Sequence, residues 1–339
     1  MFYSGIDQHK LDSVITTYNA AGERLRQHRL RNDRAALVRY FAAFPGPHRA
    51  VVESTGSWYW LRDLLVAHGV DLQLAHATRL KAISSAKVKT DAIDSDTLAQ
   101  LCQADLIPPA HMIRPEVRGA RDLLRTRLRL VGKRTSCRNS VHRLLEKFNV
   151  PTVAELPAIY QLQAACHLEQ SALLLAQIRR LEQELNPEVL RLPAVQRLLW
   201  VPGVGKLGAP TLVLEIDAIA RFPSDRQFVS YCRLVPGADN SGGKTRHRSG
   251  SKDGNRYLKI AFTHAAIRAI QYYPEIKAWY TRLARRKHVR VARTLVAKEL
   301  ARIVYHMLRT QTDYNGTFKG KALSRTKRSQ WPRLASPDA

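Results

Sequence analysis

Four acidic residues in the first third of the chain have the spacing of a metal site. Asp7 ends the apolar run 2–7, and Glu53 ends a second short apolar run, 49–53. Asp91 and Asp94 open a segment predicted to be helical, and residues three apart share one helix face. Carboxylates that converge at one sheet edge repel one another unless a cation is bound, and Mg²⁺ prefers such oxygen ligands. These acids therefore predict a site for Mg²⁺ or Mn²⁺ that could support phosphodiester chemistry.

Each of these acids also has a simpler explanation. Asp91, next to Thr90, could serve only the start of a helix, where acids favour the helix dipole. A single Asp at a strand end is usually a turn residue. The occurrence of all four, in this order on strand, strand and helix, favours the metal site.

A second candidate for chemistry is the segment 237–256, which places three serines near glycines among basic residues. A serine hydroxyl there could attack a DNA phosphate and form a covalent ester, and nearby cations would stabilise the transition state. From the residues alone, a phosphate-binding loop without catalysis explains the segment equally well. The serines are Ser241, Ser249 and Ser251, and the cations are Lys244, Arg246, Arg248, Lys252 and Arg256.

Two further patterns predict contacts with nucleic acid. The segment 200–209 is typical of the hairpin in a helix-hairpin-helix motif, in which Gly203 and Gly205 turn backbone amides toward a phosphate beside Lys206. An ordinary tight turn is the alternative. A basic helix stripe is also predicted to bind DNA or RNA, with a solvated face as its alternative. It consists of residues three or four apart: Arg118, Arg121, Arg125 and Arg129.

The elements that would position these residues fall into an α/β part followed by an α part. Residues 1–110 predict three antiparallel strands, a helix capped by Asn32, and further strands and helices. This is the order of the ribonuclease-H-like fold. Residues 111–190 predict long helices in a coiled-coil connector, and 191–312 a compact, mainly helical domain. Residues 313–339 form a basic tail that we expect to be flexible.

Composition narrows the function. The 339 residues include 55 Lys and Arg against 28 Asp and Glu, a net charge of +27 that favours a polyanionic partner such as nucleic acid. The four cysteines form no CxxC pair, which argues against a zinc site and against disulfides. No apolar run is long enough to span a bilayer, and the first residues do not resemble a signal peptide. We therefore expect a cytoplasmic, nucleoid-associated protein without a membrane partner.

The acids, the hairpin and the serine segment together resemble one known family. In their order along residues 1 to about 310, they resemble the IS110 family of insertion-sequence transposases, the DEDD or Piv/MooV-like recombinases. The motifs that carry the resemblance are Asp7, Glu53, Asp91-Ala92-Ile93-Asp94, Pro202-Gly203-Val204-Gly205 and Asn240-Ser241-Gly242-Gly243-Lys244.

This resemblance implies a RuvC-like N-terminal domain, a coiled-coil connector and a C-terminal transposase domain. It implies that Asp7, Glu53, Asp91 and Asp94 bind the metal and that Ser241 is the nucleophile, through a phosphoserine intermediate. It also implies DNA substrates from element and target, guidance by a structured bridge RNA, and homodimers that pair into tetramers. An RNA-guided transposase is thus the expected function.

Two other functions fit the residues. A Holliday-junction-type endonuclease would use the same acids for hydrolysis without a covalent intermediate, so a trapped protein–DNA adduct would distinguish the two enzymes. A non-catalytic nucleic-acid-binding relic of a transposase would show no metal-dependent strand cleavage.

Overall fold

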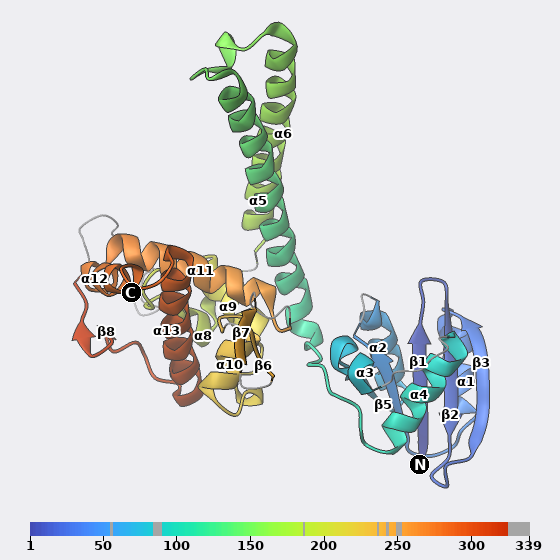
Figure 1. Ribbon diagram of the computed structural model, residues 1–339. Helices are drawn as coiled ribbons and strands as arrows, with labels where there is room; N and C mark the ends of the chain where they lie inside the picture. Colours follow the sequence, from blue (N-terminus) through green and yellow to red (C-terminus); the bar gives the residue numbers. More distant parts are fainter. Residues whose placement is uncertain are drawn as a thin grey trace. The chain divides into compact units, whose positions relative to one another are not determined.

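The computed structural model describes residues 1–54, 57–83, 90–185, 187–235, 237–241, 244–248 and 253–324 (Figure 1). The chain divides into two compact units, Met1–Ile113 and Arg114–Ala339. The first unit is mixed α/β, and the second is mostly helical, so the expected order of an α/β part and an α part is confirmed. Within the described ranges, no helix is both long enough and apolar enough to cross a membrane.

The first unit is built on a five-stranded sheet of order β3-β2-β1-β4-β5. Neighbours among β1, β2 and β3 are antiparallel, whereas β4 lies parallel to β1, and β5 parallel to β4. The strands are β1 (Phe2–Gln8), β2 (Asp12–Tyr18), β3 (Arg24–Arg31), β4 (His48–Glu53) and β5 (Val70–Ala75). The helices are α1 (Arg34–Ala42), α2 (Trp58–Ala67), α3 (Ala77–Ile83) and α4 (Asp91–Gln103).

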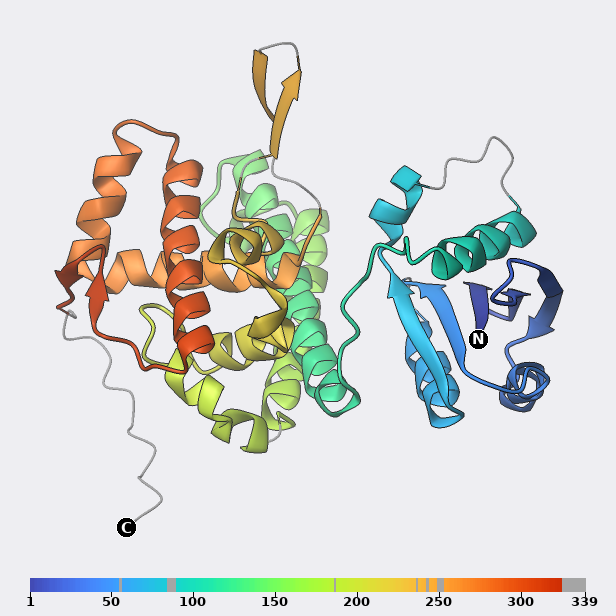
Figure 2. The same cartoon turned by 90° about the horizontal axis from the view of Figure 1, so that it is seen from below.

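Helices cover both faces of this sheet. Successive strand residues point to opposite sides, and apolar residues occur on both of them. Ile6 and Val52 pack with side chains of α1 and α2 in one apolar core. Val51, one residue earlier in β4, packs on the other face with Leu98 and Cys102 of α4. Figure 2 shows α4 and α2 on opposite sides of the strands.

The expected helix cap at Asn32 is wrong by one residue. Asp33 is the N-cap of α1, and its carboxylate accepts a hydrogen bond from the amide of Ala36 at 2.7 Å. The Asn32 side chain instead donates to the backbone oxygen of His9 and accepts from the hydroxyl of Ser13. Asn32 therefore connects β3 to the loop after β1, which leaves its neighbour to cap the helix.

The second unit contains two long helices and a compact helical body. Helices α5 (Pro115–Phe148) and α6 (Ala158–Gln183) run alongside each other (Figure 1) and enclose a small core of Val141, Leu156 and Ala164. The short 3₁₀ helix η1 (Val153–Glu155) lies between them. The compact body contains α7 (Pro187–Arg191), α8 (Pro193–Leu198), α9 (Gly208–Ile216), η2 (Ile219–Arg221), α10 (Asp225–Tyr231), α11 (Arg256–Tyr272), α12 (Pro274–Ala284) and α13 (Val289–Thr310).

Two short antiparallel pairs accompany these helices, one between α10 and α11 and the other after α13. Strands β6 (Gly237–Ser241) and β7 (Lys244–Arg248) form a hairpin, and β8 (Thr317–Phe318) pairs with β9 (Lys321–Ala322). The β6–β7 hairpin was not expected, because its residues lack the apolar alternation that identifies a half-buried strand.

Candidate functional site

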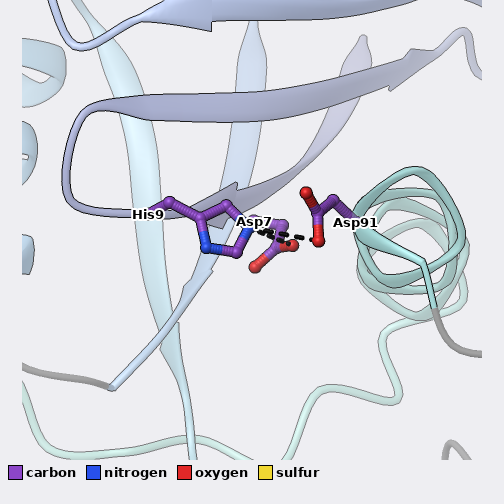
Figure 3. A group of neighbouring side chains, drawn as sticks. All are labelled: Asp7, His9 and Asp91. Carbon is purple, nitrogen blue, oxygen red and sulfur yellow. Dashed lines mark hydrogen bonds and ion pairs between the residues drawn. The ribbon is translucent and has the colours of Figure 1, made fainter.

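Two of the predicted acids meet at the end of β1, together with a histidine. The Nε2 atom of His9 lies 3.2 Å from Asp7 Oδ2 and 3.3 Å from Asp91 Oδ1 (Figure 3). One ligand atom from each of these three residues lies within 4.8 Å of the others. Two carboxylates and an imidazole at such distances are a donor set that could hold a divalent cation.

Close packing of α4 on β1 brings Asp91 to Asp7. Gly5 makes it possible, because a Cβ atom there would stand 2.1 Å from the backbone oxygen of Ser95. The hydroxyls of Thr16 and Ser95 lie 2.9 Å apart and join β2 to the same helix. α4 begins at Asp91 because the Thr90 side chain accepts a hydrogen bond from the amide of Ile93, so Thr90 is its N-cap.

The charges at this site affect the two acids in opposite directions. Burial raises the pKa of Asp7; His9 partly offsets this, and the negative charges of Asp91 and Asp94 raise the pKa further. The hydrogen bond from Arg29 lowers the pKa of Asp91. Arg29 also pairs with Asp12, so this arginine links β2 and β3 to the start of α4. Of Asp7 and Asp91, Asp7 is thus the acid whose negative charge is less compensated, and a bound cation would compensate it.

Glu53 and Asp94 lie outside the close group of three among the described residues. Asp94 is near enough to act on the pKa of Asp7. Ile6 pairs with Val52, so Asp7 and Glu53 follow paired residues on adjacent parallel strands. Glu53 also shares a sheet face with Val51, the face that α4 covers. Asp7 and Glu53 on the strands, and Asp91 and Asp94 at the start of α4, are therefore all placed at one end of the sheet, on the face that α4 covers.

His9 and Arg29 were not predicted as part of this site. His9 stands two residues after Asp7, and that spacing returns a side chain to the same side of an extended chain. This signal could have identified His9. Arg29 has no comparable signal, because it is one of many basic residues in β3.

Three of the four arginines in the predicted stripe on α5 are buried or paired inside the protein. Arg118 and Arg121 are buried, with 7% and 8% exposure. Arg121 and Arg125 both donate to the carboxylate of Glu215 in α9, which is 2% exposed and also accepts from Asn255 at 2.7 Å. Arg129 alone of the four is exposed. Spacing on a helix identifies a face, but it does not reveal a buried acid 90 residues away in the sequence.

The predicted phosphate-binding hairpin forms the turn between α8 and α9. Gly203 has φ +78, and a Cβ atom there would stand 2.0 Å from the backbone oxygen of Ala265 in α11. Gly203 is therefore needed for close packing as well as for the turn. Gly205 and Lys206 line a cavity beside the same turn.

The described structure covers the serine segment only in part. Ser241 is the last residue of β6 and pairs with Lys244, and β7 carries Arg246 and Arg248. Ser249, Ser251 and Lys252 lie outside the described residues. Arg256 is exposed at the start of α11, where the side chain of Asn255 caps the helix.

Comparison with known proteins agrees with these motifs. A model of DEDD transposases of the IS110 type matches residues 4–150, and a model described as "Transposase IS116/IS110/IS902 family" matches residues 195–281. A Pseudomonas aeruginosa protein named "Probable family 20 transposase" is 28% identical over 310 residues, 83% of this chain and 89% of its own. The transposase for insertion sequence element IS1328 of Yersinia enterocolitica is 26% identical over 325 residues, 89% of this chain and 95% of its own.

The two family models match residues in both units, and the two relatives align with this chain along most of their own length. Such enzymes process DNA, and the DEDD type indicates the use of a divalent metal. The chain belongs to the IS110 family of insertion-sequence transposases.

Proposed function

We propose that this transposase cleaves and rejoins DNA strands with Mg²⁺ or Mn²⁺ held by Asp7, Glu53, Asp91 and Asp94. The observation that carries the proposal is the meeting of Asp7, His9 and Asp91 within 4.8 Å at the end of β1. The strand order, with three antiparallel strands followed by two parallel ones, supports a ribonuclease-H-like, RuvC-like assignment for this unit.

The residues at the site suit a divalent ion. Asp7 and Asp91 offer the carboxylate oxygens that Mg²⁺ and Mn²⁺ prefer, and the imidazole of His9 adds a nitrogen of the kind that transition-metal ions accept. When bound, the ion would activate the attacking oxygen and stabilise charge on the leaving oxygen of a phosphodiester. The chain itself keeps Asp91 oriented through Arg29 and keeps Asp7 partly shielded from water.

Ser241 is the proposed nucleophile. Its Oγ would bond to the phosphorus of a DNA phosphodiester as the bond from phosphorus to the deoxyribose oxygen breaks. The proton lost from Oγ is balanced by the one that the released deoxyribose hydroxyl gains. A later attack by a DNA hydroxyl on the phosphoserine would restore the serine and join the new strand. The family resemblance and the basic residues that follow Ser241 support this role.

Lys206, Lys244, Arg246, Arg248, Lys252, Arg256 and Arg129 are proposed as phosphate contacts, together with the turn at Gly203 and Gly205. A bridge RNA and a dimer that pairs into a tetramer are proposed from the family resemblance alone. Sequencing RNA that co-purifies with the protein tests the guide, because a guide would match the non-coding flank of its own element.

The experiment that tests the chemistry combines the protein with DNA spanning its element ends, and Mg²⁺. Wild-type protein should form an adduct that survives denaturation and maps to Ser241. Asp7→Asn should lower strand cleavage on the order of a hundredfold or more. Asp71→Asn is the matched control, because Asp71 is 61% exposed and pairs with Arg49 on β4.

The other outcomes separate the alternatives. Cleavage by Asp7→Asn at the wild-type rate would refute the metal site. An adduct that persists in Ser241→Ala would move the nucleophile to Ser249 or Ser251. Metal-dependent cleavage without any adduct would favour the Holliday-junction-type endonuclease, and binding without cleavage would favour the non-catalytic relic.

A further inference from the structure

A cavity of about 550 Å³ lies within the second unit, beside the turn that connects α8 to α9. Its walls are residues 201–208 of this turn, part of α5 near Leu128, and α11 from Tyr257 to Arg268. The turn is fixed to α11, because Gly203 contacts the backbone of Ala265 too closely for any side chain. A volume of this size suits a ligand larger than a single ion.

The polar part of the lining is cationic. Its charged side chains are Arg125, Arg127, Lys206 and Arg268, and among the described residues that line the cavity none is an aspartate or glutamate. Arg125 pairs with Glu215 and Arg127 with Glu182, and both acids lie outside the lining. This lining favours an anionic ligand.

Arg268 is the cation best placed to receive such a ligand. Its Nη1 donates to two neutral oxygens, Gln271 Oε1 at 3.4 Å and the Tyr272 hydroxyl at 3.2 Å. In the part of the chain that the structure describes, Arg268 has no ion pair with an acid. The positive charges of Arg127 and Arg268 also reach His264: desolvation lowers the pKa of His264 first, and these two charges lower it further.

The rest of the lining is apolar and aromatic. Tyr257, Tyr272 and Tyr273 contribute rings, and Leu124, Leu128 and Leu212 contribute aliphatic surface. The guanidinium of Arg125 lies 4.4 Å from the centre of the Tyr257 ring, which makes a flat cationic and aromatic surface. Trp200, 74% exposed, stands between the lining residues Leu199 and Val201 in the sequence. A bare phosphate would gain nothing from these rings, whereas a nucleobase stacks on them.

We propose that this cavity takes up one unpaired nucleotide of a single strand, with the base among the tyrosines and a flanking phosphate at Arg268 and Lys206. The inference rests on the proposed function, because strand exchange separates DNA strands and so supplies unpaired nucleotides. Beyond that function, the inference assigns to the enzyme a cavity that binds an unpaired base during strand exchange.

Binding of two strands of equal charge tests the proposal. A labelled strand of about 12 thymidines is compared with an abasic strand of the same length, without metal, by fluorescence anisotropy. Wild-type protein should bind the thymidine strand about tenfold more tightly, the scale of one stacked base. A uridine strand distinguishes an RNA source from a DNA source of the nucleotide.

Three variants locate the effect. Ala261→Phe fills the cavity and should remove the preference for bases while leaving affinity for the abasic strand unchanged. Tyr272→Leu removes a ring and should reduce the same preference. Arg268→Gln should weaken binding of both strands several-fold, whereas the control Arg309→Gln removes an exposed charge outside the cavity and should change little.

Equal affinity of wild-type protein for thymidine and abasic strands would overturn the inference and leave the proposed transposition chemistry standing. A base preference that survives in both Ala261→Phe and Tyr272→Leu would also overturn it, because the base would then bind elsewhere. Failure to bind any strand would contradict both the inference and the proposed DNA chemistry.

Discussion

Substitution of Glu215 tests whether Arg121 and Arg125 stabilise the second unit instead of contacting nucleic acid. Its carboxylate is 2% exposed and accepts hydrogen bonds from Arg121 at 3.2 Å, from Arg125 at 2.8 Å and from Asn255 at 2.7 Å. Burial by itself would raise the pKa of Glu215, but the hydrogen bond from Arg125 and the charges of Arg121 and Arg125 outweigh it, so the pKa is lowered. Glu215→Gln removes this charge while keeping the size of the side chain.

The expected cost follows from the buried charges that remain. Removing one partner of a buried ion pair costs about 3–5 kcal/mol, and we expect about 3 kcal/mol because the glutamine oxygen still accepts hydrogen bonds. For a unit of this size, the cost corresponds to a fall in Tm of roughly 6–12 °C. The lowered pKa adds a pH signature. The stabilisation is present above the unfolded-state pKa of about 4.5 and is lost as the pH falls through the folded-state pKa.

Scanning calorimetry at neutral and acidic pH measures both effects. The control is Glu182→Gln, because Glu182 is 32% exposed and its pair with Arg127 should contribute less than about 1 kcal/mol. If Glu215→Gln and Glu182→Gln melt at the same temperature, the structural role assigned to Arg121 and Arg125 is wrong. An increase in DNA affinity of Glu215→Gln without loss of stability would return these arginines to the nucleic-acid interface.

Three further predictions concern the acid site and the charge of the chain. The pKa of Asp7 is raised, so the contribution of Asp7 to stability is present below about pH 3.8 and is lost as the pH rises through the folded-state pKa. In the absence of metal, Asp7→Asn should therefore become more stable relative to wild type as the pH rises through this range. Asp7→Asn should also show no increase in Tm when Mg²⁺ is added. Gly5→Ala should lower the free energy of unfolding by about 1–3 kcal/mol in denaturant titrations, because the new methyl group would stand 2.1 Å from Ser95 O, and unchanged stability would contradict the packing of α4 on β1. Affinity for duplex DNA should fall steeply between low and moderate salt as condensed cations are released, and a flat titration would argue against phosphate contacts.

The sequence predicted most of the first unit, because alternation and turn residues identify half-buried strands. The strand before Glu53 and the helix after Thr90 are confirmed. The cap of α1 was placed on Asn32 instead of Asp33, since both residue types cap helices and only tertiary contacts separate them. The hairpin that contains Ser241 was missed, because polar and basic residues dominate both of its strands.

The candidate site was predicted through its acids and not through their partners. Asp7 and Asp91 were identifiable because a residue at the end of a strand and a residue at the start of a helix that packs on the sheet can converge at the same sheet edge. Arg29 was not, because its pairing with Asp91 depends on how β3 passes the start of α4. The wall of the cavity near Arg268 was also hidden from the sequence, since it combines three segments far apart along the chain.

The net charge of the molecule is likewise a poor guide to which cations contact nucleic acid, because pairing inside the fold cannot be read from the sequence. A net charge of +27 counts every arginine equally, whether it contacts a buried carboxylate or faces solvent. On α5, Arg121 and Arg125 are paired with Glu215, whereas Arg129 is exposed on the same helix. Only cations that reach a phosphate release counterions, so the salt dependence of DNA binding must reflect fewer charges than composition suggests. We therefore expect the salt dependence of DNA binding to follow the arginines and lysines that the core leaves at the surface, and not the net charge.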